Sequence, residues 1–189
     1  MTGATLKRLL ARGLWFWLRP LGIGRLGGDV RVRFPRRLQG RRHLSIGKGV
    51  RVGGHCWIQA VTDYQGIRYQ PEIVIAEGTC IGGHCMITAV ESVRIGPGCL
   101  FSEQVFISDH AHDTFTVEVR PLSVRPLKAL GAVEIGARCF IGIRAVIMPG
   151  VRLGDHCVVG ANSVVTRSFP AGTVLAGAPA RAIRTIHSC

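Results

Sequence analysis

The chain has 189 residues and a formal net charge of +13, and 47% of its residues are hydrophobic although only 6% are aromatic. This length suits a single domain, and an apolar fraction carried mostly by aliphatic side chains favours strands over a helical bundle. No apolar run is long enough to span a bilayer, and the start of the chain lacks the small-residue cleavage site of a signal peptide. Seven cysteines in a chain of this length fit no small secreted disulfide framework, so we expect a cytoplasmic protein.

Residues 1–43 combine a basic amphipathic segment with an arginine-rich stretch. Apolar residues recur at helical spacing from Leu6 to Trp17 among lysines and arginines, and six further arginines lie between residues 31 and 42. Such a helix is typical of proteins that bind an anionic membrane surface, whereas a helix docked on the end of a sheet would cover its open edge. We predict an amphipathic helix and linker, and both roles stay open.

From residue 44 to the end of the chain, aliphatic residues recur at every sixth position in sets of three. The aligned positions are Ile46, Val52 and Ile58, then Ile75, Ile81 and Ile87, then Ile95, Phe101 and Ile107, then Ile135, Ile141 and Ile147, then Leu153, Val159 and Val165. A hexapeptide period predicts an all-β solenoid, a parallel β-helix of triangular cross-section in which each hexapeptide supplies one short strand and one turn. Residues 44–189 would then form a domain of about five coils.

Five of the cysteines occupy the fifth position of a hexapeptide, counted from its aliphatic residue. They are Cys56, Cys85, Cys99, Cys139 and Cys157. That position holds Val, Thr, Ala or Ser in the other repeats, so we interpret these cysteines as small core residues. The histidines that precede three of them fall at a solvent-side turn, and the paired spacing of a zinc site is absent, so we expect no metal.

The period breaks three times, each time after the third strand of a coil. The breaks lie between Ile58 and Ile75, between Ile87 and Ile95, and between Ile107 and Ile135. All three insertions therefore leave the same edge of the solenoid, and loops on a rigid scaffold are where function is usually placed. The longest insertion covers residues 110–132, and two histidines and two carboxylates lie around its start: Asp109, His110, His112 and Asp113.

These four residues suit acid–base chemistry. His110 and His112 share one face of the chain if the segment is extended. A neutral imidazole can remove a proton near neutral pH, and a neighbouring carboxylate such as Asp109 or Asp113 can hold its tautomer. Residues of these types suit proton transfer, so the loop is a candidate functional site.

The hexapeptide period, the stretch "ISDHAHD" at residues 107–113 and the tail "GVRLGDHCVVGANSVVTRSFPAGTVLAGAPARAIR" resemble the left-handed β-helix acyltransferases. The likeness covers roughly Ile46 to Arg184. It is greatest to the maltose, galactoside and colanic-acid O-acetyltransferases and their lipopolysaccharide acetyltransferase relatives. The resemblance implies a left-handed β-helix, acetyl-CoA as the donor, a homotrimer with sites between subunits, and a loop histidine as general base.

The resemblance also assigns site residues. Aligned without a gap from Ile107, the family's catalytic histidine falls on His112, so we predict His112 as the base and keep His110 as the alternative. Coenzyme contacts are implied near the last coils, with arginines at the phosphates, which arginine binds through paired donors. The residues implied for the coenzyme are Gly142, Ala161, Thr166, Arg167, Arg181 and Arg184.

We therefore expect a homotrimeric acetyl-CoA-dependent O-acetyltransferase. Its acceptor would be a sugar hydroxyl of a surface polysaccharide or lipopolysaccharide precursor, or a lipid-linked sugar, at the inner face of the cell membrane. The positive charge favours an anionic partner but not nucleic acid, since no aromatic-interleaved module is visible. Three alternatives stay open: an N-acetyltransferase on an amino sugar, a γ-carbonic-anhydrase-like enzyme, and a non-catalytic β-helix scaffold.

Overall fold

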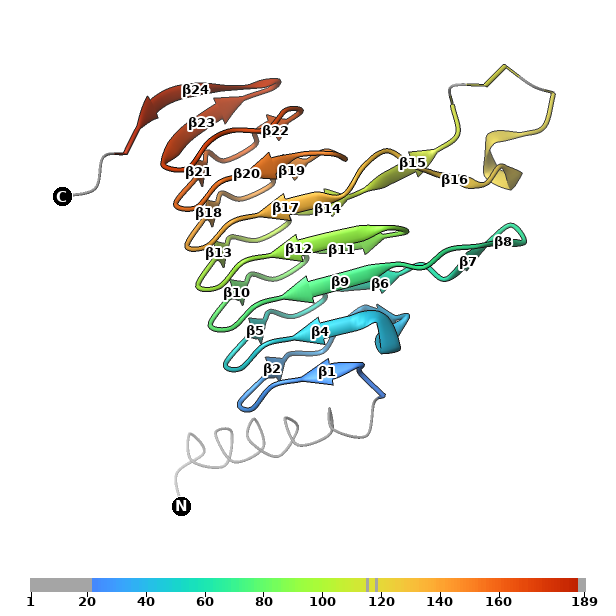
Figure 1. Cartoon of the computed structure of the whole chain (residues 1–189), viewed down its shortest axis with the longest axis horizontal. Helices are drawn as coiled ribbons and strands as arrows, with labels where there is room; N and C mark the ends of the chain where they lie inside the picture. The colour runs from blue at the N-terminus through green and yellow to red at the C-terminus, as the bar shows by residue number, and fades with distance from the viewer. Residues whose placement is uncertain (1–21, 115, 118, 187–189) are drawn as a thin grey trace.

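A computed structural model describes residues 22–114, 116–117 and 119–186, which wind into a β-helix with three parallel sheets as its walls (Figure 1). The first sheet contains β1 (Arg25–Leu26), β4 (Leu44–Ile46), β9 (Glu72–Ile75), β12 (Ser92–Ile95), β17 (Val133–Ile135) and β20 (Arg152–Leu153). The second contains β2 (Arg31–Val32), β5 (Arg51–Val52), β10 (Cys80–Ile81), β13 (Leu100–Phe101), β18 (Phe140–Ile141), β21 (Val158–Val159), β23 (Thr173–Gly177) and β24 (Ala180–Thr185). The third contains β3 (Arg37–Gln39), β6 (Trp57–Ala60), β11 (Met86–Ala89), β14 (Phe106–Ser108), β19 (Val146–Ile147) and β22 (Val164–Val165). Only β24 runs antiparallel to its neighbour in these three walls.

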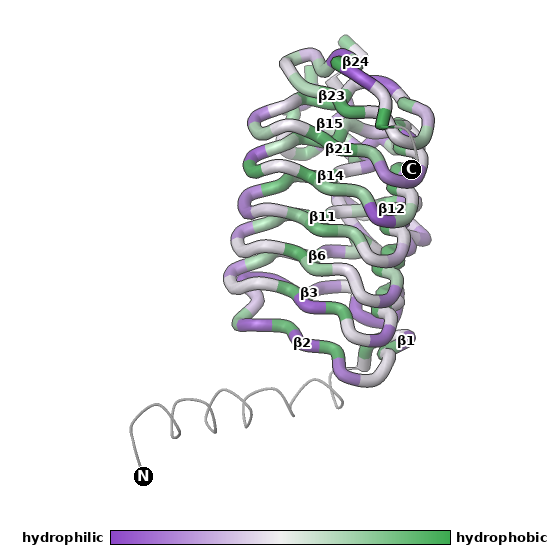
Figure 2. Tube along the Cα trace, turned by 90° about the vertical axis from the view of Figure 1, so that its left-hand side faces the viewer, coloured by the Kyte–Doolittle hydropathy of each residue, from purple (hydrophilic) through white to green (hydrophobic). Residues whose placement is uncertain are grey.

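The aliphatic residue of each hexapeptide points into the prism, as the period predicts. In the first sheet Ile46 pairs with Ile75 and Ile75 with Ile95, and this register continues through Ile135 to Leu153. All five side chains are buried. Figure 2 shows hydrophobic positions recurring from coil to coil along the solenoid. The predicted all-β solenoid with parallel sheets is confirmed, while its left-handedness stays a prediction.

The β-helix begins earlier than residue 44. Strands β1, β2 and β3 form a first coil in which Leu26, Val32 and Leu38 are six residues apart, and they pair in register with the aliphatic residues of the next coil. The solenoid therefore has six complete coils rather than about five, and residues 25–39 are not a linker. The predicted amphipathic helix lies almost entirely in residues 1–21, outside the described part of the chain. No helix among the described residues is long and apolar enough to cross a membrane.

The cysteines at the fifth position are core residues, as predicted. All five are buried, and their thiols donate hydrogen bonds to backbone carbonyls of the next coil, for example from Cys56 to Gly82 at 3.1 Å and from Cys99 to Gly136 at 3.1 Å. His55, His84 and His156 lie at exposed turns with positive φ, the conformation that closes each coil. In the described part of the chain, no three His, Cys, Asp or Glu side chains are grouped so that they could hold a metal ion.

All three insertions leave from the edge between the third and first sheets, which we call the insertion edge. They follow β6, β11 and β14, as the breaks in the period predict. Two of them fold as antiparallel hairpins on the same side of the solenoid (Figure 1). The hairpin after β6 contains β7 (Asp63–Tyr64) and β8 (Ile67–Arg68), and the arm after β14 contains β15 (His110–His112), the 3-10 helix η3 (Leu122–Val124) and β16 (Leu127–Ala129). A second 3-10 helix, η2 (Arg41–His43), lies between β3 and β4.

Candidate active site

Asp109 is the residue that fixes the geometry of the insertion edge. It follows β14 directly, and its side chain has 0% exposure. The carboxylate accepts backbone N–H groups from the short turn between β11 and β12, from Val90 at 3.0 Å and Glu91 at 2.8 Å, and from Ser92 at the start of β12 at 2.7 Å. Burial of a carboxylate is costly unless hydrogen-bond donors surround it, so these N–H groups of the preceding coil are what permit Asp109 to be buried.

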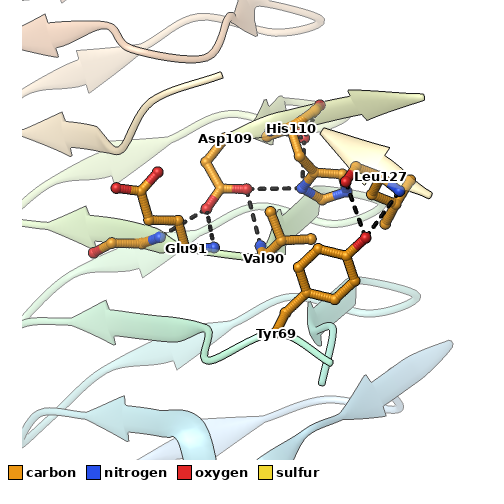
Figure 3. A network of polar contacts seen from close by, with 8 residues as sticks. Tyr69, Val90, Glu91, Asp109, His110 and Leu127 are labelled. Atoms are coloured by element: carbon orange, nitrogen blue, oxygen red, sulfur yellow. Dashed lines mark hydrogen bonds and ion pairs between the residues drawn. The ribbon is translucent and has the colours of Figure 1, made fainter. Parts of the chain in front are cut away.

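His110 is held by that carboxylate. Its Nδ1 lies 2.7 Å from Asp109 Oδ1, and 11% of its side chain is exposed. The Nδ1–H donates a hydrogen bond to the carboxylate, so the lone pair lies on Nε2, which is the tautomer that a general base requires. Ser108 adds support, since its hydroxyl donates to the His110 carbonyl at 2.8 Å and accepts the His110 N–H at 3.2 Å. Figure 3 shows the imidazole between the Asp109 carboxylate and the side where Tyr69 meets Leu127.

His112 lies two residues further along β15 in a different environment. It is exposed, and its ring meets Tyr64 edge-on, with ring centroids 5.7 Å apart and an interplanar angle of 67°. Among the described residues no carboxylate forms an ion pair with it. Asp113 faces the arm instead, where its Oδ2 accepts the hydroxyl of Thr116 at 3.1 Å. The geometry therefore joins Asp109 to His110 and favours His110, the alternative base, over His112.

Tyr69 is a further residue at this edge. Its hydroxyl donates to the Leu127 carbonyl at 2.9 Å and accepts the Leu127 N–H at 3.0 Å, so it ties the β7–β8 insertion to β16. Burial raises the pKa of the Tyr69 hydroxyl, which keeps it protonated as a donor at neutral pH. The sequence signal for it was weak: a single aromatic side chain in one of the insertions that share an edge with the histidine loop.

The six residues implied for the coenzyme lie on the last two coils and on β24. Gly142 and Ala161 follow β18 and β21 at the edge between the second and third sheets. Arg181 lies on β24 and pairs with Ala176 of β23, the strand next to β21. Thr166 and Arg167 follow β22 at the insertion edge, two coils beyond β14. Arg184 lies nearer the far end of β24, opposite Val174. Gly142 is buried and the other five are exposed. Within one chain these residues occupy different edges rather than one surface.

A separate recess lies away from the insertion edge. It measures about 700 Å³ and follows the outer face of the first sheet near the last coils. Arg94 and Arg152 line it, but they pair with Glu72 and Glu134, respectively. Neither Asp109 nor His110 lines this recess. The Asp109–His110 pair at the insertion edge, and not this recess, therefore defines the candidate site.

Known proteins that are similar to this chain share its hexapeptide repeat. Residues 132–167 match the family model described as hexapeptide repeat of succinyl-transferase. A protein of Escherichia coli named as the lipopolysaccharide biosynthesis O-acetyl transferase WbbJ is 42% identical over 101 residues, which is 50% of this chain and 51% of that protein. The chain is therefore similar to hexapeptide-repeat acyltransferases. The galactoside O-acetyltransferase of Escherichia coli is 47% identical over 55 residues, 29% of this chain and 27% of that protein.

This hexapeptide-repeat protein also resembles solved structures. The N-acyltransferase AntD from Bacillus cereus, solved with dTDP and 3-hydroxybutyryl-CoA, has a TM-score of 0.74 at 20% identity, covering 89% of this chain and 86% of that one. A maltose O-acetyltransferase from Clostridium difficile has a TM-score of 0.59 at 21% identity, covering 96% and 84%. Identities this low establish the fold alone. The chain spans about half the length, or less, of the curated relatives it matches.

Proposed function

We propose that this chain is an acetyl-CoA-dependent O-acetyltransferase that acts on a sugar hydroxyl of a surface polysaccharide or lipopolysaccharide precursor. The observation that carries the proposal is the Asp109–His110 pair, a buried carboxylate 2.7 Å from the imidazole of the insertion edge. Relatives named as O-acetyltransferases of lipopolysaccharide biosynthesis and of galactosides support the choice of reaction, and a relative named as a colanic acid biosynthesis acetyltransferase supports the acceptor class.

The pair supplies the base that acyl transfer needs. Acetyl-CoA, when bound, presents its acetyl group as a thioester. His110 Nε2 removes the proton of the acceptor hydroxyl while the hydroxyl oxygen attacks the thioester carbonyl, a contribution of about 10²–10⁴ in rate. Asp109 stabilises the imidazolium that forms. As the C–S bond breaks, His110 returns the proton to the leaving sulfur, so the enzyme ends each cycle unchanged.

We propose that the chain forms a homotrimer, and the distribution of apolar surface supports this. Large apolar side chains point outward on two faces beyond the first coil, with Leu100 and Phe140 on the second sheet and Trp57 and Phe106 on the third. Charged side chains such as Arg94 cover the first face. A three-fold ring needs two different faces of each protomer in contact. Such a ring would bring residues on opposite edges of neighbouring subunits together. Light scattering should give about three times the chain mass of 20.4 kDa, and a folded monomer would contradict the trimer.

Arg181 is proposed to bind the phosphates of the coenzyme. It is exposed on β24, above the small residues Gly142 and Ala161 at the same edge. We expect Arg181→Ala to weaken acetyl-CoA binding by about ten- to a hundredfold, since a hydrogen bond to a charged group contributes about 1.5–3 kcal/mol. Calorimetric titration with acetyl-CoA measures this. Arg51→Ala, an exposed arginine on the same sheet in an early coil, is the control and should leave the affinity unchanged.

Transfer of acetyl groups to a sugar panel tests the reaction type. The panel contains methyl hexopyranosides, nucleotide-linked hexoses and their amino-sugar counterparts, with acetyl-CoA as donor. An ester product, cleaved by mild alkali, supports O-acetylation. An alkali-stable amide formed only on amino sugars would instead support an N-acetyltransferase. Wild type that neither binds nor cleaves acetyl-CoA would leave a scaffold or a metal enzyme, and metal analysis would separate those two.

A further inference from the structure

Two insertions that are distant in sequence contact each other at the insertion edge, beside the strand that carries His110. The β7–β8 hairpin reaches the arm through Tyr64, whose hydroxyl donates to the Ser123 carbonyl at 3.4 Å, and through Gln65, whose amide donates to the same oxygen at 3.0 Å. Tyr69 adds its two hydrogen bonds to Leu127. The hairpin is therefore part of the candidate site, although it leaves the solenoid two coils before the arm.

The rings of Tyr64 and His112 form the outer part of this contact, and we call them the aromatic pair. Their edge-to-face arrangement holds two ring faces at 67° to each other. His112 is exposed and Tyr64 is half-buried, so solvent reaches the pair. Neither ring is required by the hydrophobic core, because both lie outside the prism.

The distance between the proposed base, His110, and the aromatic pair matches the size of one sugar ring. His110 and His112 are alternate residues of the short strand β15, so their side chains leave the same face, about 6.5–7 Å apart along the strand. A pyranose ring spans a similar length. Its axial C–H groups pack against the electron-rich face of an aromatic ring, an interaction that needs no charge on the sugar.

We propose that the aromatic pair, Tyr64 with His112, is the acceptor subsite and binds the apolar face of a hexopyranose so that a ring hydroxyl reaches His110 Nε2. This inference rests on the proposed function and assigns the acceptor side of the same site. It gives His112 a binding role in place of the catalytic one that the alignment implies. Tyr69 is a positioning residue in this arrangement, since it fixes β16 and hence the paired strand β15.

Ring-preserving substitutions separate the two roles of His112. His112→Ala and Tyr64→Ala are expected to raise the KM for a methyl hexopyranoside about tenfold, with the KM for acetyl-CoA changed far less. His112→Phe and Tyr64→Phe keep a ring face and should restore the acceptor KM to within about threefold of wild type. Phe34→Ala, which removes an exposed ring of the first coil, is the matched control and should leave both constants within twofold.

Four other outcomes would contradict this inference or the proposed function. If His112→Phe loses turnover as severely as His110→Ala, then His112 is the base and the inference is overturned. Unchanged acceptor KM values in both alanine variants would show that the acceptor binds away from the aromatic pair. Wild type that cleaves acetyl-CoA but uses no hexose in the panel would overturn the sugar subsite while leaving an acyltransferase. Wild type without any acyl-CoA turnover would refute the proposed function itself.

Discussion

His110→Ala is expected to lower the turnover of acetyl-CoA by about 10²–10⁴-fold, the usual contribution of a positioned general base. The affinity for acetyl-CoA should stay within about twofold of wild type, because the residues proposed to bind the coenzyme lie on the last two coils and on β24. Steady-state turnover combined with calorimetric titration measures both quantities. The physical reason is the single orientation of this imidazole: its Nδ1–H donates a hydrogen bond to Asp109 Oδ1, with 2.7 Å between the two atoms, and Nε2 is left as the acceptor.

The control for this experiment is His112→Ala in the same background. Its ring contacts Tyr64 and no carboxylate forms an ion pair with it among the described residues, so its loss should affect maximal turnover by less than about tenfold. A reversed order, with His112→Ala nearly inactive and His110→Ala active, would return the base to the residue that the ungapped alignment implies.

Asp109→Asn is expected to damage both stability and activity. The carboxylate has 0% exposure and accepts three backbone N–H groups as well as His110 Nδ1, and an asparagine amide would turn donor hydrogens toward some of those donors. Loss of one partner in a buried charged network costs about 3–5 kcal/mol in the free energy of unfolding. Turnover should fall at least about 10²-fold, because the imidazole loses the acceptor that sets its tautomer.

Urea denaturation measures the stability change, with Asp155→Asn as the matched control. Asp155 also accepts a backbone N–H, from Ala137 at 2.7 Å, but it is exposed, so its substitution should cost less than about 1 kcal/mol. Equal unfolding midpoints for Asp109→Asn and wild type would contradict the buried-carboxylate account. Full activity of that variant would contradict the pairing with His110.

Most of the fold was predictable because a β-helix repeats one short pattern. Each aliphatic residue stacks on its counterpart in the next coil, so the period in the sequence is also the register in space. The first coil escaped detection for a physical reason. The interval from Leu38 to Ile46 is eight residues rather than six, and arginines such as Arg31 and Arg37 occupy the outward strand positions there, so the segment resembles a basic linker.

The sequence predicts which loop carries the candidate site, but it does not predict which histidine pairs with Asp109. The breaks in the period place Asp109, His110 and His112 on one edge, yet nothing local to them distinguishes the two histidines. The distinction comes from the turn at Val90–Glu91, whose N–H groups receive the Asp109 carboxylate from a neighbouring coil. Contacts between the two hairpins likewise join residues 58 or 59 positions apart, which no local pattern reveals.

The most direct test of the account is the release of free CoA from acetyl-CoA by the full chain, followed with a thiol reagent in the absence of any sugar. Acetyl-CoA binding is measured in parallel. The account predicts that wild type binds acetyl-CoA and slowly cleaves it with water as the acceptor. It also predicts that His110→Ala still binds the donor but does not cleave it. A folded wild-type protein with no affinity for acetyl-CoA and no thiol release would contradict the assignment of the Asp109–His110 pair as the base of an acetyltransferase.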